Sequence, residues 1–295
     1  MSEKQHYRLV KKIKDDLFNV DDISTYNLYL QISHQLFRFC ITDSEKNRCL
    51  HLEDYRISGI THPDQLIQQL EKLYDEHHLL KAGFWKSIRL AVKNVNFSLV
   101  PNSLFDKNFL REYVSINSPQ SNTTEEGYYY YAQKSTDAVN IFSADKKIID
   151  WFCKVYPSKN IRVVHYTSSL IEGVMMSANG AEQRQMFLQV EQNYLTIIVK
   201  HNKTLEFCNT FYFYTAEDFI YFVMFVFDQL QLSQEETEVV VWGEITHDSL
   251  AYNKLVKYIR NVSLGEKPSA LKFGYTFDEI MDHNFFDLYS MHLCE

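Results

Sequence analysis

The stretch "FLQVEQNYLTIIV", residues 187–199, has nearly the same pattern as "YLQISHQLFRFCI", residues 29–41. Each reads aromatic, Leu, Gln, aliphatic, and continues through a short polar segment into a second apolar run. Two runs rich in aromatic and β-branched residues, separated by a short polar turn, are typical of a β-hairpin. The chain therefore carries the same predicted hairpin twice.

The elements that follow each hairpin also come in the same order. We expect a third strand, then a helix opened by "THPDQL" in one copy and "TAEDFI" in the other, and then a central strand. A second helix follows, at 102–114 in the first copy and at 248–260 in the second. We infer an internal duplication, the alternative being two similar hairpins that arose by chance. The strands expected in the two copies are 27–33, 36–42, 48–58 and 88–99, and 186–191, 194–200, 204–213 and 237–244.

The chain divides into an arm and two halves in this interpretation. We expect residues 1–25 to form an N-terminal arm that packs loosely or donates an edge strand, residues 26–183 the first half and residues 184–295 the second. The polar stretch 115–126 is expected to be a loop, and 177–185 the connector between the halves. Further strands are expected at 127–133, 138–143, 161–165, 261–264 and 270–276, and further helices at 144–156, 167–176 and, closing the chain, 277–293.

Composition excludes several classes of protein. The chain has 295 residues, 45% of them hydrophobic, and a net charge of −8, with no long run of Lys or Arg that would favour a nucleic-acid partner. Its five Cys residues include no CxxC pair, which fits a reducing compartment. The longest apolar run, 219–227, is far short of the roughly 20 residues that a membrane span needs. We expect a cytoplasmic protein with no membrane span and no nucleic-acid partner.

This plan of two similar halves resembles the actin-like ATPase superfamily, which includes sugar kinases, heat-shock chaperone ATPases and pilus-assembly actin homologues. The chain also resembles an uncharacterised bacterial family with that fold, through "LYLQISHQLFRFCI", "NVNFSLVPNSLF", "VVVWGEITHDS" and "LVKYIRNV". The resemblance implies an α/β fold of two similar ribonuclease H-like halves, each a mixed five-stranded sheet flanked by helices. It also implies a cleft between the halves, where active members hold their nucleotide.

In active members, the resemblance implies, each hairpin turn carries an Asp together with Gly or small residues. Gly lets backbone N–H groups approach phosphate, and Asp positions Mg²⁺ through water. Here the turns read Gln31-Ile32-Ser33-His34-Gln35 and Gln189-Val190-Glu191-Gln192-Asn193, with neither Gly nor Asp. We therefore expect no cofactor, with ATP and Mg²⁺ as the alternative. By fold position the nucleotide-lining residues would be Ser33, His34, Glu191, Gln192, Gly243 and Glu244.

Two of these residues have a plainer interpretation. Glu191 could hold a metal ion, but isolated turn carboxylates are usually solvated. Gly243 stands alone where the superfamily shows paired Gly, so it is expected to end a strand in a turn. We expect no catalytic residue and no metal site.

Other candidate sites also have structural alternatives. Asp75, His77 and His78 could share a helix face and bind metal, or the His residues could lie near a helix C-terminus. Asp282 and His283 allow the same two interpretations, a metal site or a structural role. The run 128–131, four tyrosines, is either a docking edge or a strand whose tyrosines alternate between core and surface. The run "FIYFVMFVF" is apolar all round and predicts a centrally buried helix.

Two functions follow from these observations. The leading hypothesis is a non-catalytic actin-like fold that acts as a protein-interaction or assembly module, with an unidentified protein partner. The alternative is a nucleotide-binding switch, or a divergent ATPase or sugar-kinase-like enzyme, that uses the cleft between the halves. No GxxxxGK[ST], GxSxG or HExxH motif supports another enzyme class.

Overall fold

The computed structural model describes residues 6–117, 125–177 and 184–294. Most of the loop expected at 115–126, and most of the connector expected at 177–185, lies outside the described residues. Among the described residues, no helix is both long enough and apolar enough to cross a bilayer.

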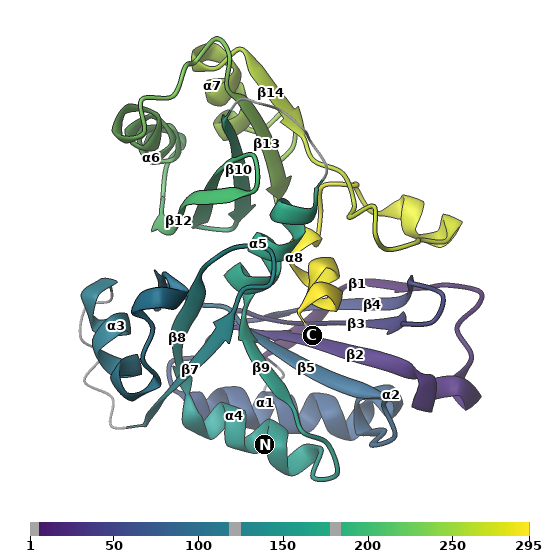
Figure 1. Cartoon of the computed structure of the whole chain (residues 1–295). Helices are drawn as coiled ribbons and strands as arrows, with labels where there is room; N and C mark the ends of the chain where they lie inside the picture. Colours follow the sequence, from purple (N-terminus) through teal and green to yellow (C-terminus); the bar gives the residue numbers. More distant parts are fainter. Residues whose placement is uncertain (1–5, 118–124, 178–183, 295) are drawn as a thin grey trace.

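Two sheets with the same strand order form the two halves (Figure 1). In each, three consecutive strands pair antiparallel, and two later strands add in parallel beside the first of them. This shared topology confirms the expected α/β fold of two similar halves. The first sheet runs β4 (Arg48–Ile57), β3 (Leu36–Asp43), β2 (Tyr26–Ile32), β5 (Ser87–Val92), β9 (Arg162–His165), and the second runs β12 (Thr204–Tyr212), β11 (Tyr194–His201), β10 (Arg184–Glu191), β13 (Glu238–Gly243), β14 (Asn261–Leu264).

The first sheet gains a sixth strand from the segment expected as an arm. Strand β1 (Tyr7–Lys14) pairs antiparallel with β4, from Tyr7 opposite Ile57 to Lys14 opposite His51. The arm therefore donates an edge strand, which was one of the two expected outcomes.

A third, three-stranded sheet is inserted in the first half, in the order β6 (Phe97–Val100), β8 (Val139–Asp145), β7 (Glu126–Ala132). The single strand expected at 88–99 is therefore wrong. The chain leaves the first sheet after Val92, where the Asn94 carboxamide accepts the backbone N–H of Asn96 at 2.8 Å and turns the backbone.

The expected correspondence between the second helices of the two copies is also wrong, because of this insertion. The helix expected at 102–114 becomes two 3₁₀ turns (Asn102–Leu104 and Lys107–Phe109) and α3 (Leu110–Asn117), all within the insertion. Helix α4 (Lys146–Val155) instead holds the place that α7 (Leu250–Tyr258) holds in the second half, between the two parallel strands.

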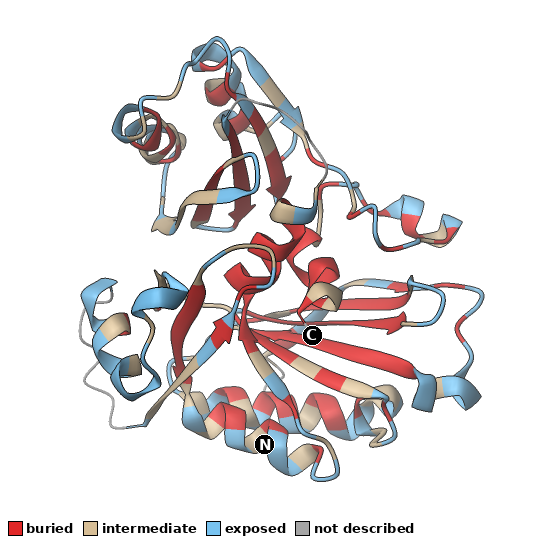
Figure 2. Cartoon of the chain, viewed as in Figure 1, coloured by how far each residue is buried: buried red, intermediate tan, exposed pale blue. Residues whose placement is uncertain are grey.

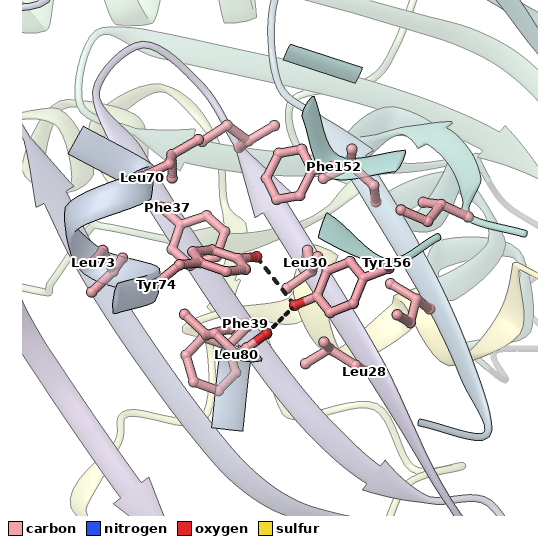
Figure 3. Close-up of a cluster of buried hydrophobic side chains, with 14 of the residues drawn as sticks. Leu28, Leu30, Phe37, Phe39, Leu70, Leu73, Tyr74, Leu80, Phe152 and Tyr156 are labelled. Carbon is pink, nitrogen blue, oxygen red and sulfur yellow. Dashed lines mark hydrogen bonds between the residues drawn. The ribbon is translucent and has the colours of Figure 1, made fainter. Parts of the chain in front are cut away.

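Helices α1 (Pro63–Glu76) and α4 cover one face of the first sheet (Figures 1 and 2). Beneath them lies an aromatic core, in which the Tyr156 hydroxyl donates to the Leu80 carbonyl oxygen at 2.7 Å and lies 3.3 Å from the Tyr74 hydroxyl (Figure 3). Leu80 belongs to the short helix α2 (His78–Lys81), so this bond ties α2 to the core. The hydroxyls of Tyr74 and Tyr156 thereby each have a hydrogen-bond partner.

In the second half, α6 (Ala216–Gln229) and α7 pack on one face of the sheet. The helix expected to open at "TAEDFI" begins with a capping box, because the Thr215 hydroxyl accepts the Asp218 N–H and the Asp218 carboxylate accepts the Thr215 N–H. The prediction of a centrally buried helix is wrong. Tyr221 is 62% exposed and Phe225 is 43% exposed, since α6 lies at the outer surface.

Helix α5 (Tyr166–Met176) and the C-terminal α8 (Phe286–Tyr289) lie between the two sheets (Figure 1). The strand expected at 270–276 and the long helix expected at 277–293 are wrong. The segment forms an isolated bridge from Lys272 to Arg48, 3₁₀ turns at Tyr275–Glu279 and Ser290–Leu293, and the one-turn α8. Its apolar side chains pack on the first sheet from irregular backbone, so tertiary contacts replace helical periodicity.

Candidate functional site

The first hairpin turn, Ser33 to Gln35, uses its own hydrogen-bonding groups. The Ser33 hydroxyl accepts the backbone N–H groups of Gln35 at 3.1 Å and of Leu36 at 3.2 Å. The Ser33 N–H donates to the Leu36 carbonyl oxygen at 3.0 Å. The N–H groups of Ser33, Gln35 and Leu36 are therefore used within the turn, whereas an anion site needs several convergent N–H groups.

A buried carboxylate, that of Glu191, lies at the start of the second hairpin turn. Gln192 turns the chain with a φ of +48°, and Glu191 before it is only 3% exposed. The Glu191 carboxylate forms ion pairs with Arg38 and with Lys93, both from the first half. The expectation of a solvated carboxylate is therefore wrong: the sequence next to Glu191 contains no cation, and its partners come from distant strands.

Glu191 belongs to a set of charged residues that we call the inter-half ion cluster. Arg38 Nε lies 2.6 Å from Asp54 Oδ1, and Arg38 Nη2 lies 3.1 Å from Glu244 Oε1. Lys93 Nζ lies 3.0 Å from Asp287 Oδ2 on α8. The cluster therefore joins the first sheet, the second sheet and the C-terminal segment. Its members are Arg38, Asp54, Arg56, Lys93, Glu191, Glu244 and Asp287.

Mutual neutralisation keeps the buried members charged. Burial alone would raise the pKa of Asp287, but Lys93 and Arg38 lower it below its ordinary value. Burial lowers the pKa of Lys93, and Asp287 opposes that shift. Burial would also lower the pKa of Arg38, whereas Asp54 and Asp287 hold it above its ordinary value. Removing one member would therefore leave a buried charge without its partner.

Gly243 and Glu244 complete the second-half side of this site. Gly243 has a φ of +96°, and a Cβ added there would lie 1.9 Å from the Val190 carbonyl oxygen. Its N–H donates to the His283 carbonyl oxygen at 2.7 Å. Gly243 therefore lets the segments that contain Val190, Gly243 and His283 approach one another closely. Glu244 lies between Arg38 and Arg56, with which it forms ion pairs.

A cavity of about 330 Å³ lies beside the cluster, lined by strands of both halves and by the segment 279–285. Buried atoms without a hydrogen-bond partner among the described residues include Gln189 Oε1 and Arg56 Nη1, and both residues line it. Such atoms suit a polar ligand or a partner's side chain.

The six positions expected at a nucleotide site do not share this cavity. Glu191, Gly243 and Glu244 line it, while His34 and Gln192 line a separate hollow of about 420 Å³ and Ser33 lines neither. Sequence reasoning missed Arg38, Asp54, Lys93 and Asp287, which carry no local motif. The duplication offered one signal: Gln31, equivalent to Gln189, donates its Nε2 hydrogen to Asp287 Oδ2 at 2.8 Å.

The histidine candidates have structural partners. His77 Nε2 lies 2.9 Å from Glu53 Oε2, whereas Asp75 pairs with Lys81 at 3.4 Å. His283 Nε2 donates to the Ile245 carbonyl oxygen at 2.8 Å. No group of three or more His, Cys, Asp or Glu residues in the described ranges could hold a metal ion.

The tyrosine run 128–131 alternates between the two faces of β7. Tyr129 packs near Phe142 on one face, and Tyr130 packs on Phe105 on the other, with ring centroids 4.9 Å apart. Tyr131 is buried and Tyr130 is 48% exposed. This pattern matches the alternation between core and surface that was one of the two readings.

Comparison with solved structures places the fold. A Bacteroides thetaiotaomicron VPI-5482 protein with actin-like ATPase fold and unknown function is 20% identical, with a TM-score of 0.80, and the match covers 95% of this chain and 100% of that one. A PilM–PilN type IV pilus biogenesis complex contains a chain that is 10% identical, with a TM-score of 0.60, covering 91% and 98%. No curated protein sequence matches this chain. A family model described as "Protein of unknown function (DUF3822)" matches residues 15–262.

Proposed function

We propose that this chain, which belongs to the DUF3822 family, is a non-catalytic actin-like protein that serves protein interaction or assembly. The observation that carries this proposal is the ion pairing of Glu191 with Arg38 and Lys93. The second hairpin turn thereby sends a carboxylate, rather than backbone N–H groups, toward the opposite half.

Electrostatics argues against a nucleotide between these turns. Each phosphate group would meet the carboxylates of Glu191 and Glu244, which already neutralise Arg38 and Lys93. Two like charges about 4 Å apart repel by about 4 kcal/mol at an effective dielectric constant of about 20. A nucleotide would therefore have to break the inter-half ion cluster to gain its cations.

Analogy supports a protein partner. The similar pilus-biogenesis chain was solved as a complex of PilM with PilN, so a fold of this kind can carry a bound protein. For this chain the proposed partner is a protein in the cytoplasm and not a nucleic acid. The proposed extents are 1–25 for the arm, 26–183 for the first half and 184–295 for the second.

A nucleotide-binding switch or divergent enzyme is the second candidate, and the 330 Å³ cavity favours it. The cavity is lined by Gly243 and Glu244, two of the positions expected near a nucleotide, and by Arg56, whose buried Nη1 has no hydrogen-bond partner among the described residues. Ligand binding there would not use the first hairpin turn.

Calorimetric titration of the full chain with ATP and ADP, with and without Mg²⁺, tests both candidates. We expect no saturable binding, whereas micromolar affinity, about −8 kcal/mol, would overturn the leading proposal. If nucleotide binds in the cavity, Arg56→Gln weakens it at least tenfold, while Arg8→Gln on the exposed edge of β1 leaves it unchanged. Repeated affinity purification from native cells without any stoichiometric protein would also contradict the interaction role.

A further inference from the structure

Strand β12 (Thr204–Tyr212) is a sheet edge with one β-bulge near its start, at Glu206, and regular pairing from Phe207 to Tyr212. Among the described residues it pairs with β11 alone, through eight residue pairs. Its only charged residue, Glu206, lies 2.8 Å from Arg184 of its own sheet. The edge strand β1 differs, because it carries four cations: Arg8, Lys11, Lys12 and Lys14. Charged residues on an edge oppose pairing with another chain, and β12 presents none outward.

The outward backbone groups of β12 follow from its pairing with β11. The Phe213 N–H donates inward, to the Asn193 carbonyl oxygen at 2.9 Å. Because successive residues of an antiparallel strand alternate, Cys208, Thr210 and Tyr212 direct their backbone groups away from β11. The outward N–H of Thr210 is held only by the Asn209 side chain, at 2.8 Å. A neighbouring strand could replace that local bond with a ladder bond.

An aromatic strip continues from this edge onto α6, half-buried at Phe207, Phe211 and Phe222 and exposed at Tyr221 and Phe225. Ring centroids lie 6.5 Å apart for Phe207 and Phe211, 4.7 Å for Phe211 and Phe222, 5.4 Å for Phe222 and Tyr221, and 6.4 Å for Tyr221 and Phe225. The strip therefore runs unbroken from the strand to the two most exposed rings of α6. Exposed aromatic surface of this kind marks interaction sites.

We propose that β12 and the aromatic strip bind a second copy of this chain, joining the two second-half sheets edge to edge. In an antiparallel pair with its two-fold axis at Thr210, Cys208 of one copy faces Tyr212 of the other, so outward groups meet outward groups. The same axis sets Phe207 opposite Phe213. This self-association goes beyond the proposed function and does not depend on it.

Charge argues for a second copy over a foreign strand. The chain carries a net charge of −8, yet this edge and strip are neutral apart from the internally paired Glu206. Two copies can therefore approach here without the repulsion they would meet at β1, where both edges carry cations. Nothing on the β12 edge selects a partner of opposite charge, whereas its apolar rings can pack against the same rings of a second copy.

Sedimentation of the full-length chain over two decades of concentration tests the proposal. We expect a reversible dimer, and Asn209→Lys should weaken it at least tenfold by placing two cations across the axis. Phe84→Lys is the matched control, because Phe84 is 74% exposed on the first half, and it should leave dimerisation unchanged. Phe225→Ser, on α6, provides a second weakening variant that leaves the strand intact.

Amide hydrogen exchange supplies an independent readout. The N–H groups of Cys208, Thr210 and Tyr212 should gain protection as concentration rises, in wild type and not in Asn209→Lys. A chain that stays monomeric throughout, or a dimer that Asn209→Lys and Phe225→Ser leave as tight as wild type, overturns the proposal. If the chain stays monomeric, the β12 edge would be free to pair with a strand of a different protein.

Discussion

His165 is a fully buried histidine whose hydrogen bonds select its neutral form. Its Nδ1 lies 2.6 Å from the Thr167 hydroxyl, and its Nε2 lies 3.2 Å from the Asn94 carbonyl oxygen. A carbonyl only accepts, so Nε2 carries the hydrogen and Nδ1 accepts from Thr167. Burial, together with the nearby Lys93, lowers the pKa of His165 to about 3, although the Asn94 bond opposes this shift.

The lowered pKa of His165 predicts a loss of stability in acid. The unfolded chain takes up a proton near pH 6.5 and the folded chain does not until about pH 3. Unfolding free energy should therefore fall between these values as pH drops, by about 1.4 kcal/mol per unit from this group. Urea unfolding of His165→Gln should show a shallower pH dependence than wild type. The exposed His62→Gln is the control, and equal slopes for all three proteins would contradict the prediction.

Gly243 lies where only glycine fits. Its φ of +96° and the 1.9 Å approach of a Cβ to the Val190 carbonyl oxygen predict that Gly243→Ala destabilises the chain by more than about 1 kcal/mol. The cause is structural, so the loss should occur without any ligand. Gly83→Ala is the matched control, because a Cβ there meets nothing within 4 Å and the change should be neutral or slightly stabilising. Chemical denaturation of both variants measures the difference.

At the level of elements, α5 crosses the C-terminal segment at a glycine. A Cβ on Gly173 would lie 2.3 Å from Ser290 Oγ and 2.8 Å from Phe286 Cε1. The absent side chain lets α5 and α8 pack closely between the two sheets. The crossing is therefore fixed by one small residue on α5.

Gly173→Ala should push α8 away from α5 and lower the unfolding free energy by about 1–3 kcal/mol, the usual cost of overpacking. Ser290→Ala removes the nearest clashing atom, so the double variant should recover part of the loss. Thermal unfolding of the two single variants and the double variant completes the cycle. Strict additivity of the single effects would show that the two side chains do not meet.

The sequence predicts the elements whose signals are local. Both hairpins, the capped start of α6 and the repeated order of strands lie within a few residues of where the pattern set them. The break after Val92 was missed, because a turn formed by the Asn94 side chain interrupts an otherwise continuous apolar pattern. The C-terminal helix was overpredicted, because its apolar residues fill the face of the first sheet without forming one helix face.

The candidate site was less predictable than the fold. Glu191, Gly243 and Glu244, expected near a nucleotide by fold position, line one cavity, but the cations that pair with Glu191 lie on β3 and after β5. No spacing rule connects Arg38 to Glu191, since their contact depends on how the two halves dock.

For the whole molecule, the inter-half ion cluster predicts that Glu191 is a stabilising residue. Glu191→Gln removes the carboxylate that pairs with both Arg38 and Lys93, while Asp54, Glu244 and Asp287 remain as counter-charges, so the unfolding free energy should fall by about 1–3 kcal/mol. Amide exchange should rise in α5 and α8, which lie between the halves. The exposed Glu236→Gln is the control. A Glu191 variant as stable as wild type would mean that the halves dock without this contact.

The return of residues 265–294 to the first sheet has a consequence during synthesis. Leu288, Tyr289 and Met291 share one core cluster with Tyr29 and Leu52, which leave the ribosome long before them. Until the last turn emerges, that face of the first sheet has no native cover and exposes apolar surface. The first half therefore cannot complete its fold before residues 288–291 have emerged, so the nascent chain should depend on chaperones until then.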